Sequence, residues 1–80
     1  MEMDIKDKIE RLRAKAEIFL KDNLKAFIVD IADNYYFCYV IFVGDNSIYV
    51  QHFTGKKKLE KERIFYPDII KFEEYKEEVK

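Results

Sequence analysis

The sequence predicts a single α+β domain, in which an N-terminal amphipathic helix precedes a strongly curved antiparallel sheet or small barrel of four to five strands. Apolar residues first recur every three or four positions, and from Leu24 onward the period changes to two, with turn residues between the β-rich runs. The chain has 80 residues, 49% of them hydrophobic and 39% charged, with two Gly and one Pro, which suits one regularly patterned domain. We expect a helix in residues 1–23 and a β-rich part in 24–80.

The helix prediction depends on a stripe of apolar residues that lie three or four positions apart and therefore share one face. The stripe consists of Ile5, Ile9, Leu12, Ala16 and Phe19. Asp4 is the expected N-cap, and Asn23 is the expected C-terminal stop. Because the stripe is shorter than three heptads, it favours packing on the domain's own sheet over a coiled coil.

Four strands are expected after the helix. A first run starts at Leu24 and leads through the turn residues Asp33 and Asn34 into the apolar run 35–43. A Gly-Asp-Asn-Ser turn then precedes a strand over 48–54, and a fourth strand is expected over 59–66. Pro67 ends that strand, because proline cannot donate a ladder hydrogen bond.

The segment after Pro67 has two interpretations. Residues 70–72 can form a short fifth strand, which we favour slightly. Alternatively, Pro67 and Asp68 can open a C-terminal helix, which would give an α-β-β-β-β-α order. The apolar face of that helix would consist of Ile69, Phe72, Tyr75 and Val79.

The order of these elements resembles that of the Sm-like small β-barrels. Asp33, Asn34 and Tyr36 look like the start of the second Sm strand, residues 44–50 look like the acidic turn before the third, and residues 65–72 resemble the one-turn link between the last two strands. The resemblance implies a small barrel. The asparagine that follows the acidic turn in the family, and its Arg-Gly pair, have no counterpart here, so no RNA site is carried over.

Composition limits the possible classes of protein. Cys38 is the single cysteine, so no intramolecular disulfide can form, and the charged N-terminus does not read as a signal peptide, which predicts a reducing cytoplasmic location. The longest apolar run, 35–43, is under half of the roughly 20 residues that a membrane helix needs, and we expect no membrane association. Abundant Lys and Glu beside scarce Gln are typical of thermophile proteins.

No catalytic or metal site is predicted, and no cofactor. A Cys-His pair would have to join Cys38 to His52, the only histidine, but no third group orients them, so we expect a buried thiol and a strand histidine. These two residues also fall short of the four ligands of a structural zinc site. Asp30, Asp33 and Asp45 are the only charges between residues 26 and 54, and turn formation accounts for them better than a cation site.

One segment, 55–66, is clearly basic, and aromatic residues flank it. Lysine and arginine neutralise phosphates and aromatic rings stack on bases, which is how single-stranded nucleic acids are held. We therefore predict weak binding of RNA or single-stranded DNA. The expected contact residues are Lys56, Lys57, Lys58, Lys61, Arg63, Tyr49, Phe53 and Tyr66.

The run 35–43 is apolar on both faces, and a domain this small has little with which to cover both. It predicts a homo-oligomer or protein-partner interface that includes Tyr35, Tyr36, Tyr39 and Phe42. Two functions therefore stay open. The leading one is a small non-enzymatic module that self-associates and binds nucleic acid, and the alternative is a protein-interaction or scaffold module whose lysines only confer solubility.

Overall fold

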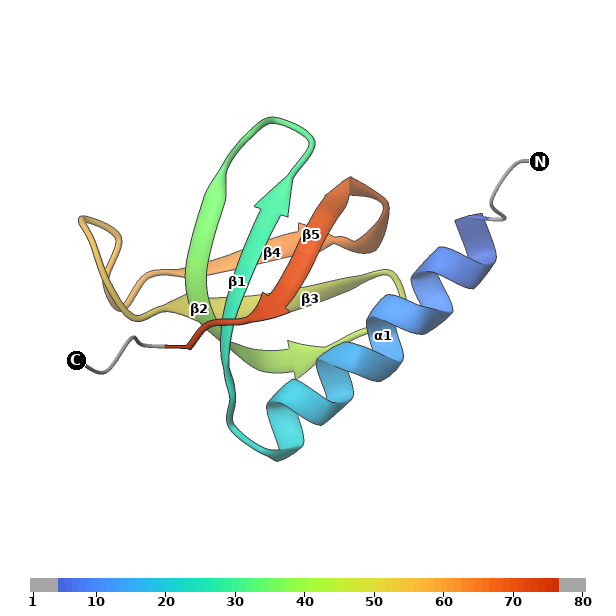
Figure 1. The fold of residues 1–80 in the computed structure, drawn as a ribbon, viewed down its shortest axis with the longest axis horizontal. Coiled ribbons are helices and arrows are strands. Elements are labelled where there is room, and N and C mark those ends of the chain that lie inside the picture. The colour runs from blue at the N-terminus through green and yellow to red at the C-terminus, as the bar shows by residue number, and fades with distance from the viewer. Residues whose placement is uncertain (1–4, 77–80) are drawn as a thin grey trace.

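A computed structural model describes residues 5–76 and has one helix followed by a five-stranded antiparallel sheet (Figure 1). This confirms the α+β prediction and the choice of a strand over a helix after Pro67. The expected cap at Asp4 and the position of Val79 lie outside the described residues. The elements are α1 (Ile5–Lys21), β1 (Lys25–Asp30), β2 (Tyr35–Val43), β3 (Ser47–His52), β4 (Lys61–Phe65), the 3-10 turn η1 (Tyr66–Asp68) and β5 (Ile69–Glu74).

The strands lie in the order β4-β3-β2-β1-β5, so β4 and β5 are the two edges of an open sheet. In Figure 1, β3 and β4 run across the view while β1 and β5 run steeply, which reflects the strong twist of the sheet. Within residues 5–76 the two edges do not pair, so the closed-barrel form of the prediction is not what this chain adopts.

The helix ends where the sequence predicts. Asn23 has a φ of 55°, a left-handed conformation that asparagine tolerates, and the N–H of Leu24 bonds to the carbonyl of Phe19 at 3.0 Å. This αL turn reverses the chain directly into β1. Asp33, with a φ of 68°, serves the same purpose between β1 and β2.

The core lies between α1 and the inner face of the sheet, which we define as the face turned toward the helix. Ala16 and Phe19 are buried, Ile9 and Leu12 pack partly against the core, and Ile5 is exposed. The predicted stripe is therefore correct except at its first residue. The sheet contributes the other core residues: Ala26, Ile28, Tyr36, Cys38, Val40, Ile48, Val50, Ile64, Tyr66, Ile69 and Phe72.

Two β-bulges change which side chains face the core. In β2, Val40 pairs with Val50 and Phe42 with Tyr49, which leaves Ile41 as the extra residue. In β5, Ile70 is extra, because Lys71 pairs with Val29 and Ile69 with Asp30. Strict alternation would put Phe42 on the face of Val40. The bulge turns Phe42 outward instead, where it is exposed.

Candidate nucleic-acid interface

The face of the sheet that is turned away from α1, the outward face, is rich in aromatic residues. Of the thirteen aromatic side chains of the protein (six Tyr and seven Phe), nine lie on it. The most exposed of those on β3, β4 and the end of β2 are Phe42 (56%), Phe65 (42%) and Tyr49 (38%). The full set is Phe27, Tyr35, Phe37, Tyr39, Phe42, Tyr49, Phe53, Phe65 and Tyr75.

Most of these rings contact one another in sequence across the strands. Phe27 lies between Tyr35 and Phe37, with ring centroids 5.8 and 5.1 Å away. Tyr75, just after β5, contacts Phe37 at 5.7 Å and Phe53 at 5.6 Å. The contacts continue from Phe53 to Tyr39 at 5.5 Å. Aromatic pairs at such separations add to stability beyond their buried area, so the rings are held in place by their neighbours.

Cations lie over these rings. The Lys25 ammonium is 5.2 Å from the centre of the Phe53 ring, and the Lys71 ammonium is 5.7 Å from that of Phe27. Arg63 lies over two rings, at 5.7 Å from Tyr49 and 4.5 Å from Phe65. These distances are within the range of cation–π attraction. The outward face therefore alternates positive charge with aromatic surface.

The Arg63 side chain is oriented by a hydrogen bond. Its Nε donates to the hydroxyl oxygen of Ser47 at 2.9 Å, across the β3–β4 pair. On the other side of Tyr49, the Phe42 ring lies 5.9 Å away in an edge contact. Phe42, Tyr49, Arg63 and Phe65 thus form one exposed cluster, which we call the Arg63 cluster.

Four of the residues predicted to contact nucleic acid lie together on the outward face: Tyr49, Phe53, Lys61 and Arg63. Tyr66 does not. It is completely buried, and its hydroxyl donates a 2.7 Å hydrogen bond to the carbonyl of Gly44. Residues on opposite sides of β4 alternate, and Tyr66 falls on the inner side with Ile64. Its ring cannot stack on a base, so this member of the predicted set is wrong.

The lysines of the β3–β4 loop differ from one another. Lys57 donates to the Glu62 carboxylate at 3.1 Å, and the same oxygen lies 2.9 Å from Nε2 of His52. Burial alone would raise the pKa of Glu62, but these partners lower it below its usual value. Lys56 and Lys58 are exposed. Lys56 and Lys57 also line a shallow depression beside the rings of Tyr35 and Phe37.

Of the residues predicted to form an interface, Tyr35, Tyr39 and Phe42 lie on the outward face. Tyr36 is in the core, 7% exposed, so a partner cannot reach it and its assignment is corrected. The Tyr36 ring packs against His52 at 5.6 Å. Its burial and its bond to Asp30 raise the pKa of the phenol well above the usual value.

Asp30 organises the β1–β2 turn from inside the core. One carboxylate oxygen accepts hydrogen bonds from the backbone N–H groups of Ala32 and Asn34, both at 2.9 Å, and the other accepts from Asn34 Nδ2 and the Tyr36 hydroxyl. Burial tends to raise the pKa of Asp30, but these hydrogen bonds outweigh it, so the pKa lies below the usual 3.8. Turn formation was the role expected of Asp30, Asp33 and Asp45, and the hydrogen bonds of Asp30 are of this kind.

Cys38 and His52 are direct partners across β2 and β3, which the sequence alone did not reveal. The thiol is nevertheless inaccessible, and burial together with the charge of Glu62 raises the pKa of Cys38 to about 12. An activated nucleophile needs a lowered pKa. Among residues 5–76, no group of three or more His, Cys, Asp or Glu lies close enough to hold a metal ion.

Sequence reasoning missed part of the outward face. Phe27, Phe37, Phe65 and Tyr75 belong to it, as do the cations Lys25 and Lys71. The period-two alternation of side chains in each of the five strands would have revealed them. In β1, this alternation puts Lys25, Phe27 and Val29 on one side.

Comparisons of this chain with protein-family models, with curated proteins and with solved structures found no match. In the described part of the chain, α1 is the sole α-helix and is not apolar enough to cross a membrane.

Proposed function

We propose that this domain binds single-stranded nucleic acid on the outward face of its sheet. The observation that carries the proposal is the position of Arg63, which lies over both Tyr49 and Phe65 while Phe42 lies next to Tyr49. Exposed rings supply stacking surfaces for bases, and an arginine among them supplies donors for phosphate. Stacking tolerates any base, so the expected recognition is of single strands without strong sequence preference.

The other cations of this face extend the proposed binding surface. Lys61 lies two residues before Arg63 on the outward side of β4. Lys25 lies over the ring of Phe53, just after β3, and Lys71 lies over a ring of β1. Glu73 of β5 is an acidic residue among the outward residues of the described strands, and its carboxylate would repel phosphate. We therefore assign the main contact with nucleic acid to the opposite side of the sheet, at the Arg63 cluster. Lys56 and Lys58 of the loop complete the basic surface.

Fluorescence anisotropy with labelled oligo(U) and oligo(dT) tests this function. Tyr49→Ala and Phe42→Ala should each lower affinity for both oligonucleotides by about five- to 150-fold, the equivalent of about 1–3 kcal/mol per stacked base. Ile70→Ala, an apolar truncation on β5 at a position that is 61% exposed, is the control and should leave affinity unchanged. Equal affinity of all three variants and the parent protein would refute stacking at this cluster.

A second candidate is an interface with another copy of this chain or with a partner protein. The observation that favours it is the exposure of Phe42, whose ring contacts that of Tyr49, together with the exposure of Ile41 and Phe65. The order of one helix and five strands also supports a relationship to Sm-like barrels. Sedimentation at micromolar concentration tests it: Phe42→Glu should convert an oligomer to monomers, whereas a parent protein that is already monomeric would exclude it.

A further inference from the structure

A pocket lies between the β1–β2 turn and the β3–β4 loop, at the end of β2 that is opposite to the Arg63 cluster. It has a volume of about 390 Å³, which is within the range of small-molecule sites. Tyr35 and Phe37 of the outward face line it together with His52 of the inner face, so it lies at the rim where the two faces meet. We call it the loop pocket.

His52 presents a nitrogen without a hydrogen bond to this pocket. The residue is 4% exposed, and its Nε2 donates to the Glu62 carboxylate at 2.9 Å. Nδ1 makes no hydrogen bond within residues 5–76, and none of their fully buried side-chain nitrogens or oxygens lacks a partner, so Nδ1 must open on the pocket that His52 lines. With the hydrogen on Nε2, Nδ1 of the neutral imidazole is an acceptor. A ligand that donates an N–H into the pocket would satisfy it.

The first half of the β3–β4 loop forms one wall of the pocket and has unused backbone donors. The N–H groups of residues 58–60 donate to carbonyl oxygens at 3.2, 3.0 and 2.8 Å, which fixes the second half of the loop. Those of residues 54–57, which line the pocket, donate to no acceptor in the described part of the chain. Gly55 has a φ of 81°, and a Cβ added to it would meet no atom within 4 Å, so the backbone is open here. Successive N–H groups in a turn form a concavity that binds anions.

The same wall carries an unpaired positive charge. Lys57 donates to the Glu62 carboxylate at 3.1 Å, so an acidic neighbour compensates its charge. Lys56 is exposed and makes no ion pair or hydrogen bond with any residue that the structure describes. No acidic residue lines the pocket. The Lys56 ammonium is therefore available to an anion that the backbone N–H groups hold.

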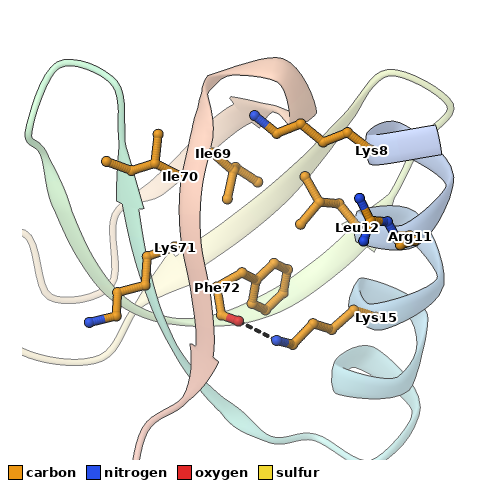
Figure 2. A pocket seen from close by; sticks show the side chains of 8 residues that line it. All are labelled: Lys8, Arg11, Leu12, Lys15, Ile69, Ile70, Lys71 and Phe72. Carbon is orange, nitrogen blue, oxygen red and sulfur yellow. Dashed lines mark hydrogen bonds between the residues drawn. The ribbon is translucent and has the colours of Figure 1, made fainter. Parts of the chain in front are cut away.

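The helix lysines of the groove between α1 and β5 differ from Lys56, because their ammonium groups bond to the chain itself. Lys8, Arg11 and Lys15 line this groove from the helix (Figure 2). The Lys15 Nζ donates to the carbonyl of Phe72, and the Lys8 Nζ donates to that of Pro67 at 3.2 Å. These two ammonium groups hold α1 against the β5 segment, so they are not free to bind a ligand.

The aromatic wall of the loop pocket suits a planar group. Tyr35 is 58% exposed, and its ring contacts that of Phe27 at 5.8 Å, which orients it and leaves much of its surface open. Bases stack on aromatic side chains of this kind. A simple anion would leave this ring and His52 unused, and an apolar ligand would leave the N–H groups and Lys56 unused. A ligand that unites a base with a phosphate uses all of them.

We propose that the loop pocket binds a nucleotide that carries a phosphate monoester. The monoester has a charge of about −1.5 to −2 at neutral pH and three acceptor oxygens, and it accepts from the N–H groups of residues 54–57 and from the Lys56 ammonium. The base stacks on Tyr35 and donates an N–H to Nδ1 of His52. This inference goes beyond strand binding at the Arg63 cluster, because internal nucleotides of a strand carry no monoester. The ligand is either a free nucleotide or the phosphorylated end of a strand, and the experiments below distinguish the two.

The test is an amide NMR titration of isotopically labelled protein with thymidine 5′-monophosphate and, as the matched ligand without phosphate, thymidine. The monophosphate should shift the amide signals of residues 54–57 with a dissociation constant below about 1 mM, and thymidine should bind at least about tenfold more weakly. Lys56→Gln should weaken binding of the monophosphate at least about fivefold and leave that of thymidine unchanged. Lys58→Gln removes the same charge from a lysine that does not line the pocket, and it should bind the monophosphate like the parent protein.

A change in the ligand tests His52 without altering the fold. Thymidine 5′-monophosphate that is methylated at N3 of the base cannot donate to Nδ1, and it should bind at least about fivefold more weakly. Equal binding of the methylated and unmethylated ligands, equal binding of thymidine and its monophosphate, no binding of the monophosphate at about 1 mM, or an equal loss in Lys56→Gln and Lys58→Gln would each overturn the proposal.

Oligo(dT) with and without a 5′-phosphate then identifies the source of the nucleotide. Tighter binding of the phosphorylated oligonucleotide, lost in Lys56→Gln, would support the end of a strand as the ligand. Binding of thymidine 5′-monophosphate without that difference would support a free nucleotide. Failure of both oligonucleotides to bind would refute the function proposed for the Arg63 cluster and leave the nucleotide site of the loop pocket to be judged by the titrations alone.

Discussion

The hydroxyl of Tyr36 donates a 2.8 Å hydrogen bond to the Asp30 carboxylate inside the core. Asp30 closes the β1–β2 turn through the N–H groups of Ala32 and Asn34, so this bond ties the turn to the inner side of β2. Because successive residues of a strand point to opposite faces, fixing Tyr36 inward fixes Tyr35 and Phe37 outward. A buried polar contact thus positions part of the candidate binding surface.

Asp30→Asn should destabilise the protein by about 1.5–3 kcal/mol at neutral pH, because it removes a charged acceptor from a buried network. The pKa of Asp30 is lowered by folding, so its ionised form stabilises the folded state at pH values above the usual 3.8. That contribution is lost as the pH falls through the lowered folded-state pKa. Urea unfolding over a pH series should therefore find a difference between parent and variant that shrinks toward acid, and a constant difference would contradict this account.

Cys38 should be unreactive in the folded protein. Its thiol is buried, and burial with the nearby charge of Glu62 raises its pKa to about 12, so almost no thiolate forms at neutral pH. Iodoacetamide should label the protein in denaturant and leave it unlabelled in buffer. Labelling in buffer at the rate of a free thiol would mean that β2 and β3 open easily.

Phe19→Ala should cost about 3–5 kcal/mol. Phe19 is the large buried side chain of α1, and its ring meets that of Phe72 edge-on at 4.8 Å. Ile18→Ala, the adjacent and exposed position, is the control and should stay within about 0.5 kcal/mol. Chemical denaturation measures both, and similar values would show that the helix does not pack on the sheet through this face.

Tyr66→Phe distinguishes a core tyrosine from a stacking one. The variant loses the hydrogen bond to the Gly44 carbonyl and should be less stable by about 0.5–1.5 kcal/mol. Its affinity for oligo(U) should equal that of the parent protein, since the ring is inaccessible. A stability equal to the parent's would contradict the hydrogen bond, and a drop in affinity without unfolding would contradict the burial of this ring.

Local patterns predicted the elements of this fold well, because caps, turns and apolar periods act over a few residues. Asn23 ends the helix as expected, and residues 69–74 form a strand. The assignment of faces was harder. The bulge at Ile41 depends on how β2 pairs with β3, which is a tertiary relationship, so Phe42 emerged on the opposite side.

Only part of the candidate site could be predicted from the sequence, because the rest depends on which strands pair. Lys61, Arg63, Tyr49 and Phe53 come from neighbouring strands, and their proximity in sequence sufficed to group them. Lys25 and Lys71 reach the outward face only through the pairing of β1 with β2 and β5. Alternation within single strands does not reveal which strands lie side by side.

The salt dependence of oligo(U) binding tests the central claim most directly. Lys25, Lys61, Arg63 and Lys71 are the cations of the outward strands, and four phosphate contacts on a single strand predict a slope of log affinity against log salt of about −3. Lys61→Gln/Arg63→Gln should reduce the slope to about −1.4, and Lys8→Gln/Arg11→Gln should leave it near −3. A slope that Lys61→Gln/Arg63→Gln does not change, or no binding tighter than about 1 mM at low salt, would contradict nucleic-acid binding at this face.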